Sequence, residues 1–307
     1  MTALSPTLLW TRMETLSIAA TGFQSINIDG RNQMSIVLNE YDWAERAINN
    51  HDLGKKPIET LNRVSKYYLE NHYSKREIRK LLDTFMMQCD PQVSLVHWSD
   101  VLDKVAKNAG KYPLIRLDGI DISKPELEKI ETLGGKQIRR LAFTLLCVAK
   151  YWDCVSEQNN HWVNSPDKEI MQMANIKTSI KRQSLMFAEL RNAGFIRFSK
   201  KIDNLNVQVL FMTPGETAIH IQDFRNLGYQ YLKYYGEPYF DCVNCGITTK
   251  IQEPSRGRKQ KYCPSCAVEL HTKQKVDSVM RHRNSLKLLL TLQKKMRFVK
   301  NTPTSIS

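Results

Sequence analysis

Residues 179–198, SIKRQSLMFAELRNAGFIRF, decide the fold of the middle of the chain. They predict a helix over 180–192, capped by Thr178 or Ser179, because short polar side chains accept hydrogen bonds from the free N–H groups at a helix start. Gly194 follows where a left-handed residue commonly ends a helix. The segment therefore contains a complete helix and the beginning of the next element.

That next element is a strand, and the sequence predicts a hairpin. The run 195–198 is apolar and aromatic, and 207–211 alternates as a returning strand would. On the helix before them, Ile180, Phe187 and Leu190 are expected to share the inner face.

The residues upstream of this segment extend the same unit. Residues 137–152 carry a wide apolar face and predict a long helix, and 161–163 predict a short strand. Ser165 is expected to cap a further helix over 167–173, with Pro166 at its first position. The order is helix, short strand, helix, turn, helix, hairpin.

Over residues 136–212 this order resembles winged helix-turn-helix domains, with ELRNAGFIRF similar to the end of a recognition helix entering the wing. The resemblance implies that the third helix enters the major groove of duplex DNA, where base edges can be distinguished. Arginine and glutamine can make bidentate base contacts, and lysines suit phosphates. The expected contacts on the helix are Lys177, Ser179, Lys181, Arg182, Gln183 and Ser184, and those at the wing tip are Lys200, Lys201 and Asn204. The other interpretation is that these are solvated side chains of a domain that binds protein.

Two CxxC pairs near the C-terminus carry the sharpest chemical signal. Cys242 and Cys245 are separated by 17 residues from Cys263 and Cys266. Two such knuckles supply four thiolates to one tetrahedral ion, which predicts one structural Zn²⁺ with no open position. Redox cysteines are the alternative, and an iron–sulfur cluster fits this spacing less well. The segment resembles a zinc ribbon of nucleic-acid-associated proteins.

Cations surround this predicted ribbon. The loop between the knuckles and the helix predicted over 268–299 are expected to contact phosphates, with an affinity that falls as salt rises. The expected contacts are Arg256, Arg258, Lys259, Lys261, Lys273, Lys275, Arg281 and Arg283.

Between this unit and the middle one lies a segment rich in tyrosine, residues 229–239. These tyrosines could stack on bases, but the preferred interpretation is that they belong to a packed helix over 217–235.

The sequence predicts small helices in the front of the chain, and this part carries no excess charge. Residues 38–50 and 56–72 show helical apolar spacing, Ser74 opens a capping box, and Ser99 is expected to cap a helix ending near residue 108. Residues 113–122 predict a strand or an extended connector before a helix capped by Ser123. These helices are expected to mediate oligomerisation or bind a protein partner.

Charge is distributed unevenly along the 307 residues, whose net charge is +14. Residues 1–133 carry 17 basic and 18 acidic side chains, 134–233 carry 14 and 8, and 234–307 carry 14 and 5. Concentrated positive charge attracts polyanions. The alternative is a charge excess that serves solubility alone.

Composition excludes several classes of protein. A hydrophobic fraction of 42% is that of a globular chain, and no apolar stretch is long enough to predict a membrane span. An odd number of cysteines, seven, argues against a disulfide framework and favours a reducing, cytoplasmic setting. Phosphate-binding loops and hydrolase motifs are absent from the sequence, so we expect no catalytic residues and no enzyme.

The expected fold is mainly α, with a helical N-terminal region, a central winged helix-turn-helix and a C-terminal four-cysteine zinc ribbon followed by a basic helix. Its parts are expected at 1–33 (a loosely ordered extension, or a product of start-codon choice), 34–133 (helical domain), 134–235 (winged helix), 236–270 (ribbon), 271–300 (basic helix) and 301–307 (disordered tail).

The organisation resembles phage or mobile-element replication-initiation or transcription-regulatory proteins that bind double-stranded DNA. The alternative is a structural or protein-interaction subunit of a larger nucleoprotein machine.

Overall fold

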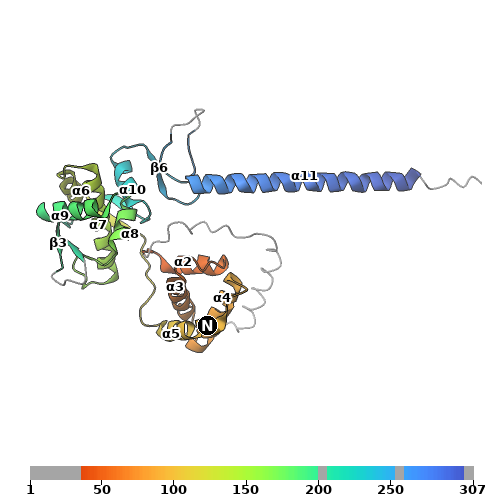
Figure 1. The fold of residues 1–307 in the computed structure, drawn as a ribbon, viewed down its shortest axis with the longest axis horizontal. Coiled ribbons are helices and arrows are strands. Elements are labelled where there is room, and N and C mark those ends of the chain that lie inside the picture. Colours follow the sequence, from red (N-terminus) through yellow and green to blue (C-terminus); the bar gives the residue numbers. More distant parts are fainter. Residues whose placement is uncertain (1–35, 200–205, 253–258, 301–307) are drawn as a thin grey trace, which may run out of the picture.

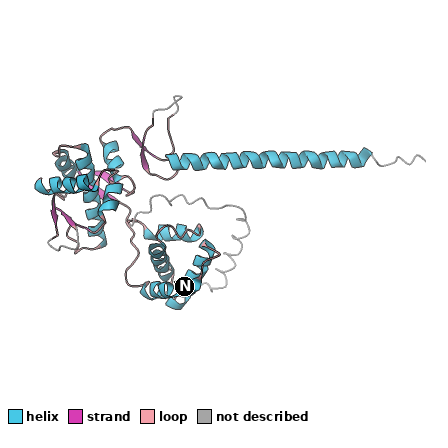
Figure 2. Ribbon diagram, in the orientation of Figure 1, coloured by secondary structure: helices cyan, strands magenta, loops and turns pink. Residues whose placement is uncertain are grey.

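The computed structural model of the protein describes residues 36–199, 206–252 and 259–300. Within them the chain is mainly helical with a few small sheets, as the sequence predicted (Figures 1 and 2). The expected extension 1–33 and tail 301–307 lie outside the described residues.

The front helices pack around their own apolar core. Leu61, Leu82, Phe85 and Leu102 are almost fully buried in it. The helices are α2 (Glu40–Asn49), α3 (Pro57–Glu70), α4 (Lys75–Cys89) and α5 (Leu95–Asn108). The predicted capping box that opens α4 is confirmed, since Ser74 and Glu77 each bond to the other's backbone.

One boundary of this group was predicted wrongly. The helix expected to start at Ser99 starts at Leu95, with Ser94 at the N-cap. Leu95 and Trp98 pack against the front core, so the apolar face extends one turn further back than Ser99 suggested. The Ser99 hydroxyl instead accepts a hydrogen bond from Arg79 (3.4 Å).

A second, larger core is built around α7 (Lys136–Val155). Helix α6 (Lys124–Glu131), capped by Ser123 as predicted, contributes Leu127 and Ile130 to it. Strand β1 (Ile120–Ser123) contributes Ile120 and Ile122. The division expected between residues 133 and 134 therefore falls inside this core.

The rest of this unit contains a helix pair followed by a three-stranded antiparallel sheet. The helices are α8 (Asp167–Met173) and α9 (Ile180–Asn192), and the strands, in sheet order, are β2 (Trp162–Val163), β4 (Val207–Val209) and β3 (Ile196–Phe198). Ser179 caps α9 by accepting from the Arg182 N–H, and Gly194 has φ +75°, both as predicted. The N-cap of α8 is Pro166 rather than Ser165.

One residue of α9 is placed differently from the prediction. Ile180, expected on the inner face, is 81% exposed. The buried face of α9 is formed by Met186, Phe187 and Leu190, so the helix packs through its later turns and its first turn is free.

The helix expected over 217–235 is also wrong in its first half. Thr217–Ile221 is strand β5, which pairs antiparallel with β1, and only Leu227–Tyr234 is helical, as α10. The β-branched alternation of Thr217, Ile219 and Ile221 suits a strand once a partner edge is present. That partner lies about a hundred residues earlier in the chain.

The last part begins with a two-stranded hairpin, β6 (Tyr239–Asp241) and β7 (Thr248–Lys250), and ends in α11 (Pro264–Lys300). With 37 residues, α11 is about 55 Å long. In Figure 1 it extends away from the other elements as a single straight helix.

A glycine in α10 supplies a test of this packing. A Cβ at Gly228 would lie 2.0 Å from the Ala174 carbonyl oxygen, in the turn after α8. Although alanine favours helices, we expect Gly228→Ala to destabilise the protein by about 1–3 kcal/mol, because backbone would have to move. Urea denaturation measures the change.

The matched control is Gly134→Ala, because nothing lies within 4 Å of a Cβ at that position. It should change the free energy of unfolding by less than about 0.5 kcal/mol. Equal stability of the two variants would contradict the close approach of α10 to the turn.

Candidate metal centre and candidate nucleic-acid interface

The first CxxC pair follows β6 and forms a tight turn. The Gly246 N–H donates to the Cys242 carbonyl (2.8 Å), and the Cys242 N–H donates to the Ile247 carbonyl (3.0 Å). Gly246 has φ +73°, which glycine adopts without steric cost. This geometry returns the chain so that both sulfurs of the pair face the same side.

The second pair sits where α11 begins. Cys263 precedes the helix and Cys266 lies in its first turn, with the Ala267 N–H donating to the Cys263 carbonyl (2.9 Å). The two pairs are joined by a backbone hydrogen bond from Val243 N–H to the Lys261 carbonyl (3.0 Å). The second pair is thus fixed to both α11 and the first pair.

The structure brings all four predicted cysteines together. Their sulfur atoms lie within 4.8 Å of one another, and the Cys245 and Cys263 sulfurs are 3.7 Å apart. That distance is well beyond a disulfide bond of about 2.05 Å. Cys242, Cys263 and Cys266 are buried and Cys245 is partly exposed. The cluster could hold a metal ion.

The four thiols differ in acidity. Burial acts to raise the pKa of Cys242, but hydrogen bonds from the N–H groups of Cys263, Cys245 and Asn244 outweigh it and lower that pKa to about 6. Burial raises the pKa of Cys245 and of Cys266. The Cys242 sulfur is therefore the first to carry the negative charge that metal ligands need.

Polar contacts that the sequence analysis did not identify attach the cysteine hairpin to the middle unit. Arg225 donates to the Cys245 carbonyl (2.6 Å), and the Asn226 amide donates to the Thr248 carbonyl (2.9 Å). Asn175, in the turn between α8 and α9, donates to the Asn226 side chain (2.7 Å). Both asparagines have positive φ, a conformation that asparagine tolerates, but their sequence gives no sign that they meet.

Most of the predicted contacts on α9 are exposed. Lys177, Lys181 and Arg182 face solvent, while Ser179 is exposed and also caps the helix. Two further side chains bond within the protein. The Gln183 amide donates to the Thr178 carbonyl (3.2 Å) and the Ser184 hydroxyl to the Ile180 carbonyl (3.2 Å). Their hydrogen-bonding groups are thus partly engaged by the helix and its cap.

Five other predicted contacts lie outside the described residues, namely Lys200, Lys201, Asn204, Arg256 and Arg258. Lys259 and Lys261, which follow them, are described and exposed.

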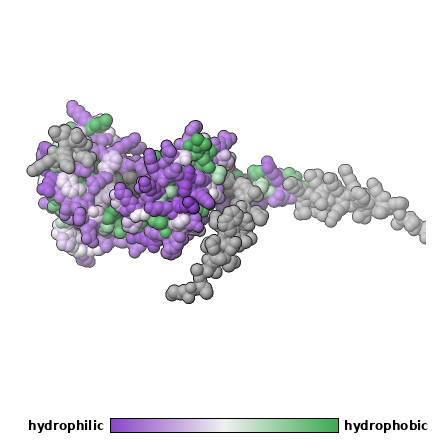
Figure 3. Space-filling view, turned by 90° about the horizontal axis from the view of Figure 1, so that it is seen from below, coloured by the Kyte–Doolittle hydropathy of each residue, from purple (hydrophilic) through white to green (hydrophobic). Residues whose placement is uncertain are grey.

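Helix α11 presents the rest of the predicted contacts to solvent. Lys273, Lys275, Arg281 and Arg283 are all exposed, and the Arg281 guanidinium also donates to the Asp277 carbonyl (3.3 Å). Apolar residues such as Val276 and Met280 are exposed between them, and the described start of the helix shows both kinds of residue side by side (Figure 3). Of these apolar residues, Val276, Val279 and Met280 recur at the three- and four-residue spacing of one helix face.

Some cations of the protein are neutralised by ion pairs and others are not. In the front, Arg63 pairs with Glu40 (3.0 Å), and Arg79 pairs with both Asp83 and Asp103. A set of exposed cations lies on α9 or just before it, beside the second knuckle and on α11. None of them forms an ion pair with another described residue; they are Lys177, Lys181, Arg182, Lys259, Lys261, Lys273, Lys275, Arg281 and Arg283. Their charged groups therefore remain available to an external anion, although Glu269 and Asp277 lie one helical turn from Lys273 on α11.

None of the helices in the part of the chain that the structure describes combines the length and apolarity that crossing a bilayer requires. Comparison with protein-family models, with curated proteins and with solved structures finds no match to this chain.

The cysteine cluster leads to a direct test by mass spectrometry under native conditions. We expect one metal ion per chain, and Cys263→Ser should lose it because one of four ligands is removed. The control is Cys154→Ser, which alters an exposed cysteine outside the cluster and should leave the ion bound. A chain that carries no metal, or a Cys263→Ser variant that keeps it, would contradict the assignment.

Proposed function

We propose that the protein is a non-catalytic factor that binds double-stranded DNA in a sequence-dependent manner. The elements from α7 to β4 would act as a winged helix with α9 as its recognition helix. The cysteine hairpin would act as a zinc ribbon, and with α11 it would bind the phosphate backbone.

The observation that carries this proposal is the set of cations without ion-pair partners on α9, beside the second knuckle and on α11. Residues 134–307 contain 28 basic and 13 acidic side chains, whereas residues 1–133 are balanced. A solubility surface does not require cations to be separated from carboxylates. Phosphate binding is favoured by that separation, because an internal ion pair competes with the contact to DNA.

Element order and exposure support α9 as the recognition helix. Its first turn projects Ile180, Lys181 and Arg182 into solvent while its later turns are buried. In helix-turn-helix proteins the N-terminal residues of the second helix contact base edges in the major groove. Arg182 is suited to guanine and Lys181 to phosphate, whereas one N–H of the Gln183 amide is already used in its bond to the Thr178 carbonyl.

The set of four thiolates in two CxxC pairs favours zinc as the ion, and the distance between two of the sulfurs is compatible with it. Tetrahedral Zn–S bonds of about 2.3 Å place neighbouring sulfurs about 3.8 Å apart. The 3.7 Å between Cys245 and Cys263 fits that edge. Four sulfur ligands leave no position for a reacting water, so the ion would be structural and would hold the hairpin and the start of α11 in place.

We place such a factor in phage or mobile-element replication initiation or transcription regulation, with the front helices contacting a second copy or another protein. The alternative remains a structural or protein-interaction subunit of a nucleoprotein machine. A DNA-binding measurement separates the two, because the alternative requires no affinity for free duplex.

A gel-shift series against duplex DNA over a range of salt concentrations tests the proposal. We expect binding at low salt, with the logarithm of the affinity falling by about 0.9 per phosphate contact for each tenfold rise in salt. The double variant Lys181→Ala, Arg182→Ala should bind about tenfold or more weakly, because it loses one phosphate and one base contact.

The matched control removes two cations from the front unit. Arg76 and Lys80 are exposed on α4, so Arg76→Ala with Lys80→Ala makes the same charge change away from α9. It should keep nearly the wild-type affinity. Absence of binding at low salt would overturn the proposal and favour the interaction subunit. Equal losses of DNA affinity in the two double variants would exclude α9 as the recognition helix.

A selection from a random duplex pool tests sequence dependence. We expect the pool to converge on a site in which the position read by Arg182 is guanine, and Arg182→Ala should relax the preference at that position alone. Recovery of unrelated sequences with unchanged salt dependence would show that binding occurs through the backbone only.

A further inference from the structure

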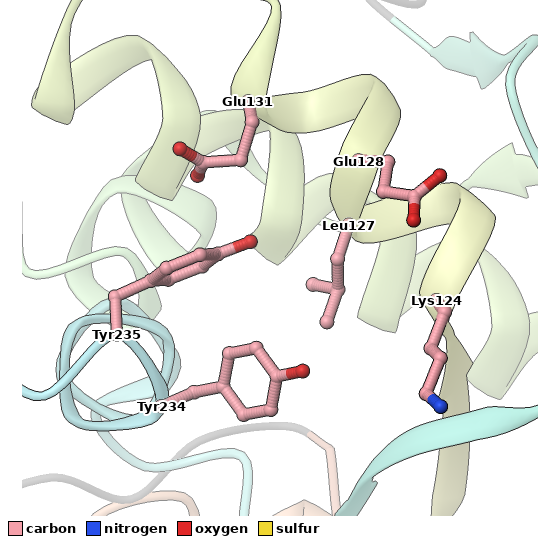
Figure 4. Close-up of a pocket in the computed structure, with 6 residues that line it drawn as sticks. All are labelled: Lys124, Leu127, Glu128, Glu131, Tyr234 and Tyr235. Atoms are coloured by element: carbon pink, nitrogen blue, oxygen red, sulfur yellow. The ribbon is translucent and has the colours of Figure 1, made fainter.

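A pocket in the middle unit lies on a surface that the proposed function does not use. It has a volume of about 390 Å³ and opens between α6 and α10. Six residues line it (Figure 4), Lys124, Leu127, Glu128, Glu131, Tyr234 and Tyr235. The two tyrosines belong to the aromatic run that the sequence analysis singled out.

The aromatic wall of the pocket is formed by two neighbouring rings. Those of Tyr234 and Tyr235 lie 5.1 Å apart at an angle of 86°. The side chains are 46% and 42% exposed, although large aromatic residues are usually more buried. Burial and the nearby Glu131 raise the pKa of Tyr235 to about 12, so its hydroxyl stays neutral at physiological pH. Opposite them, Leu127 provides an apolar floor that is 2% exposed.

The charges around the pocket leave one carboxylate without an ion-pair partner, although Glu128 attracts Lys124 at longer range. Glu131 pairs with Arg139 (2.7 Å) and accepts a hydrogen bond from Tyr231. Lys124 pairs with Glu216 (2.6 Å). Glu128 is exposed and has no hydrogen-bond or ion-pair partner among the described residues. The lining and its direct partners therefore carry one net negative charge, in a chain whose net charge is +14.

We propose that this pocket binds one organic cation, an ammonium or guanidinium group on an aliphatic stem. Aromatic faces attract cations through their quadrupole, and the attraction grows when the site is partly desolvated. Glu128 would supply the counter-charge, and Leu127 would contact the stem. A phosphate or another anion is disfavoured by the net negative charge of the lining and its direct partners. The cation would come either from a lysine or arginine side chain of a protein partner or from a free polyamine.

The experiment uses the full-length protein and saturation-transfer NMR with small probes. We expect n-butylguanidinium and n-butylammonium to bind about fivefold more tightly than n-butanol, which has a similar stem and no charge. Tyr234→Ala and Glu128→Gln should each weaken cation binding by about fivefold, because they remove an aromatic face and the counter-charge.

Two control variants keep the test specific. Tyr112→Ala removes an exposed tyrosine and Glu157→Gln an exposed carboxylate, both away from the pocket. Neither should change binding of the probes. The proposal is overturned if butanol binds as tightly as the cations, or if the pocket variants and the controls behave alike.

The source of the cation is distinguished by two larger probes. A capped Gly-Arg-Gly tripeptide that binds more tightly than spermidine supports a protein side chain, and the reverse order supports a polyamine. Loss of duplex DNA binding in Lys181→Ala, Arg182→Ala with unchanged probe binding would show that the two sites are separate.

Discussion

Burial of α7 is the packing interaction on which the described middle unit depends. Helices α6, α8, α9 and α10 and strands β1, β2 and β4 all pack against it. Its apolar residues are buried around most of the helix, from Ile138 to Tyr151, which is typical of a central rather than a surface helix. The orientation of α9, and so the direction in which Lys181 and Arg182 point, is set through this shared core.

The cysteine hairpin is held by a different kind of interaction. Its buried cluster consists of Cys242, Cys263 and Cys266, with only Cys245, Ile247 and Tyr262 packed against it among the described residues. So small an apolar core contributes little folding free energy, and metal coordination would supply most of what this segment lacks. Arg225 and Asn226 then connect the hairpin to the middle unit by hydrogen bonds to its backbone.

The excess positive charge of the chain is confined to its middle and rear, because residues 1–133 are balanced and residues 134–307 carry 28 basic and 13 acidic side chains. Arg63 and Arg79 of the front helices pair with internal carboxylates, whereas the exposed cations of α9 and α11 named above form no ion pair with another described residue. The pocket between α6 and α10 carries the opposite charge. The two proposals therefore assign a polyanion and an organic cation to separate surfaces of one basic protein.

The sequence by itself determined many, though not all, of the local features of this protein, since the caps predicted at Ser99 and Ser165 are displaced. The caps at Ser74, Ser123 and Ser179, the left-handed Gly194 and the paired cysteines all follow from short-range chemistry, and each was predicted correctly. Tertiary structure decided the rest. Thr217–Ile221 became a strand because β1 offers an edge, Ile180 is exposed because α9 packs through later turns, and Asn175, Arg225 and Asn226 meet the hairpin only in the folded chain. Caps and knuckles are formed by residues a few positions apart, whereas these contacts join segments whose separation in the sequence carries no sign of their proximity.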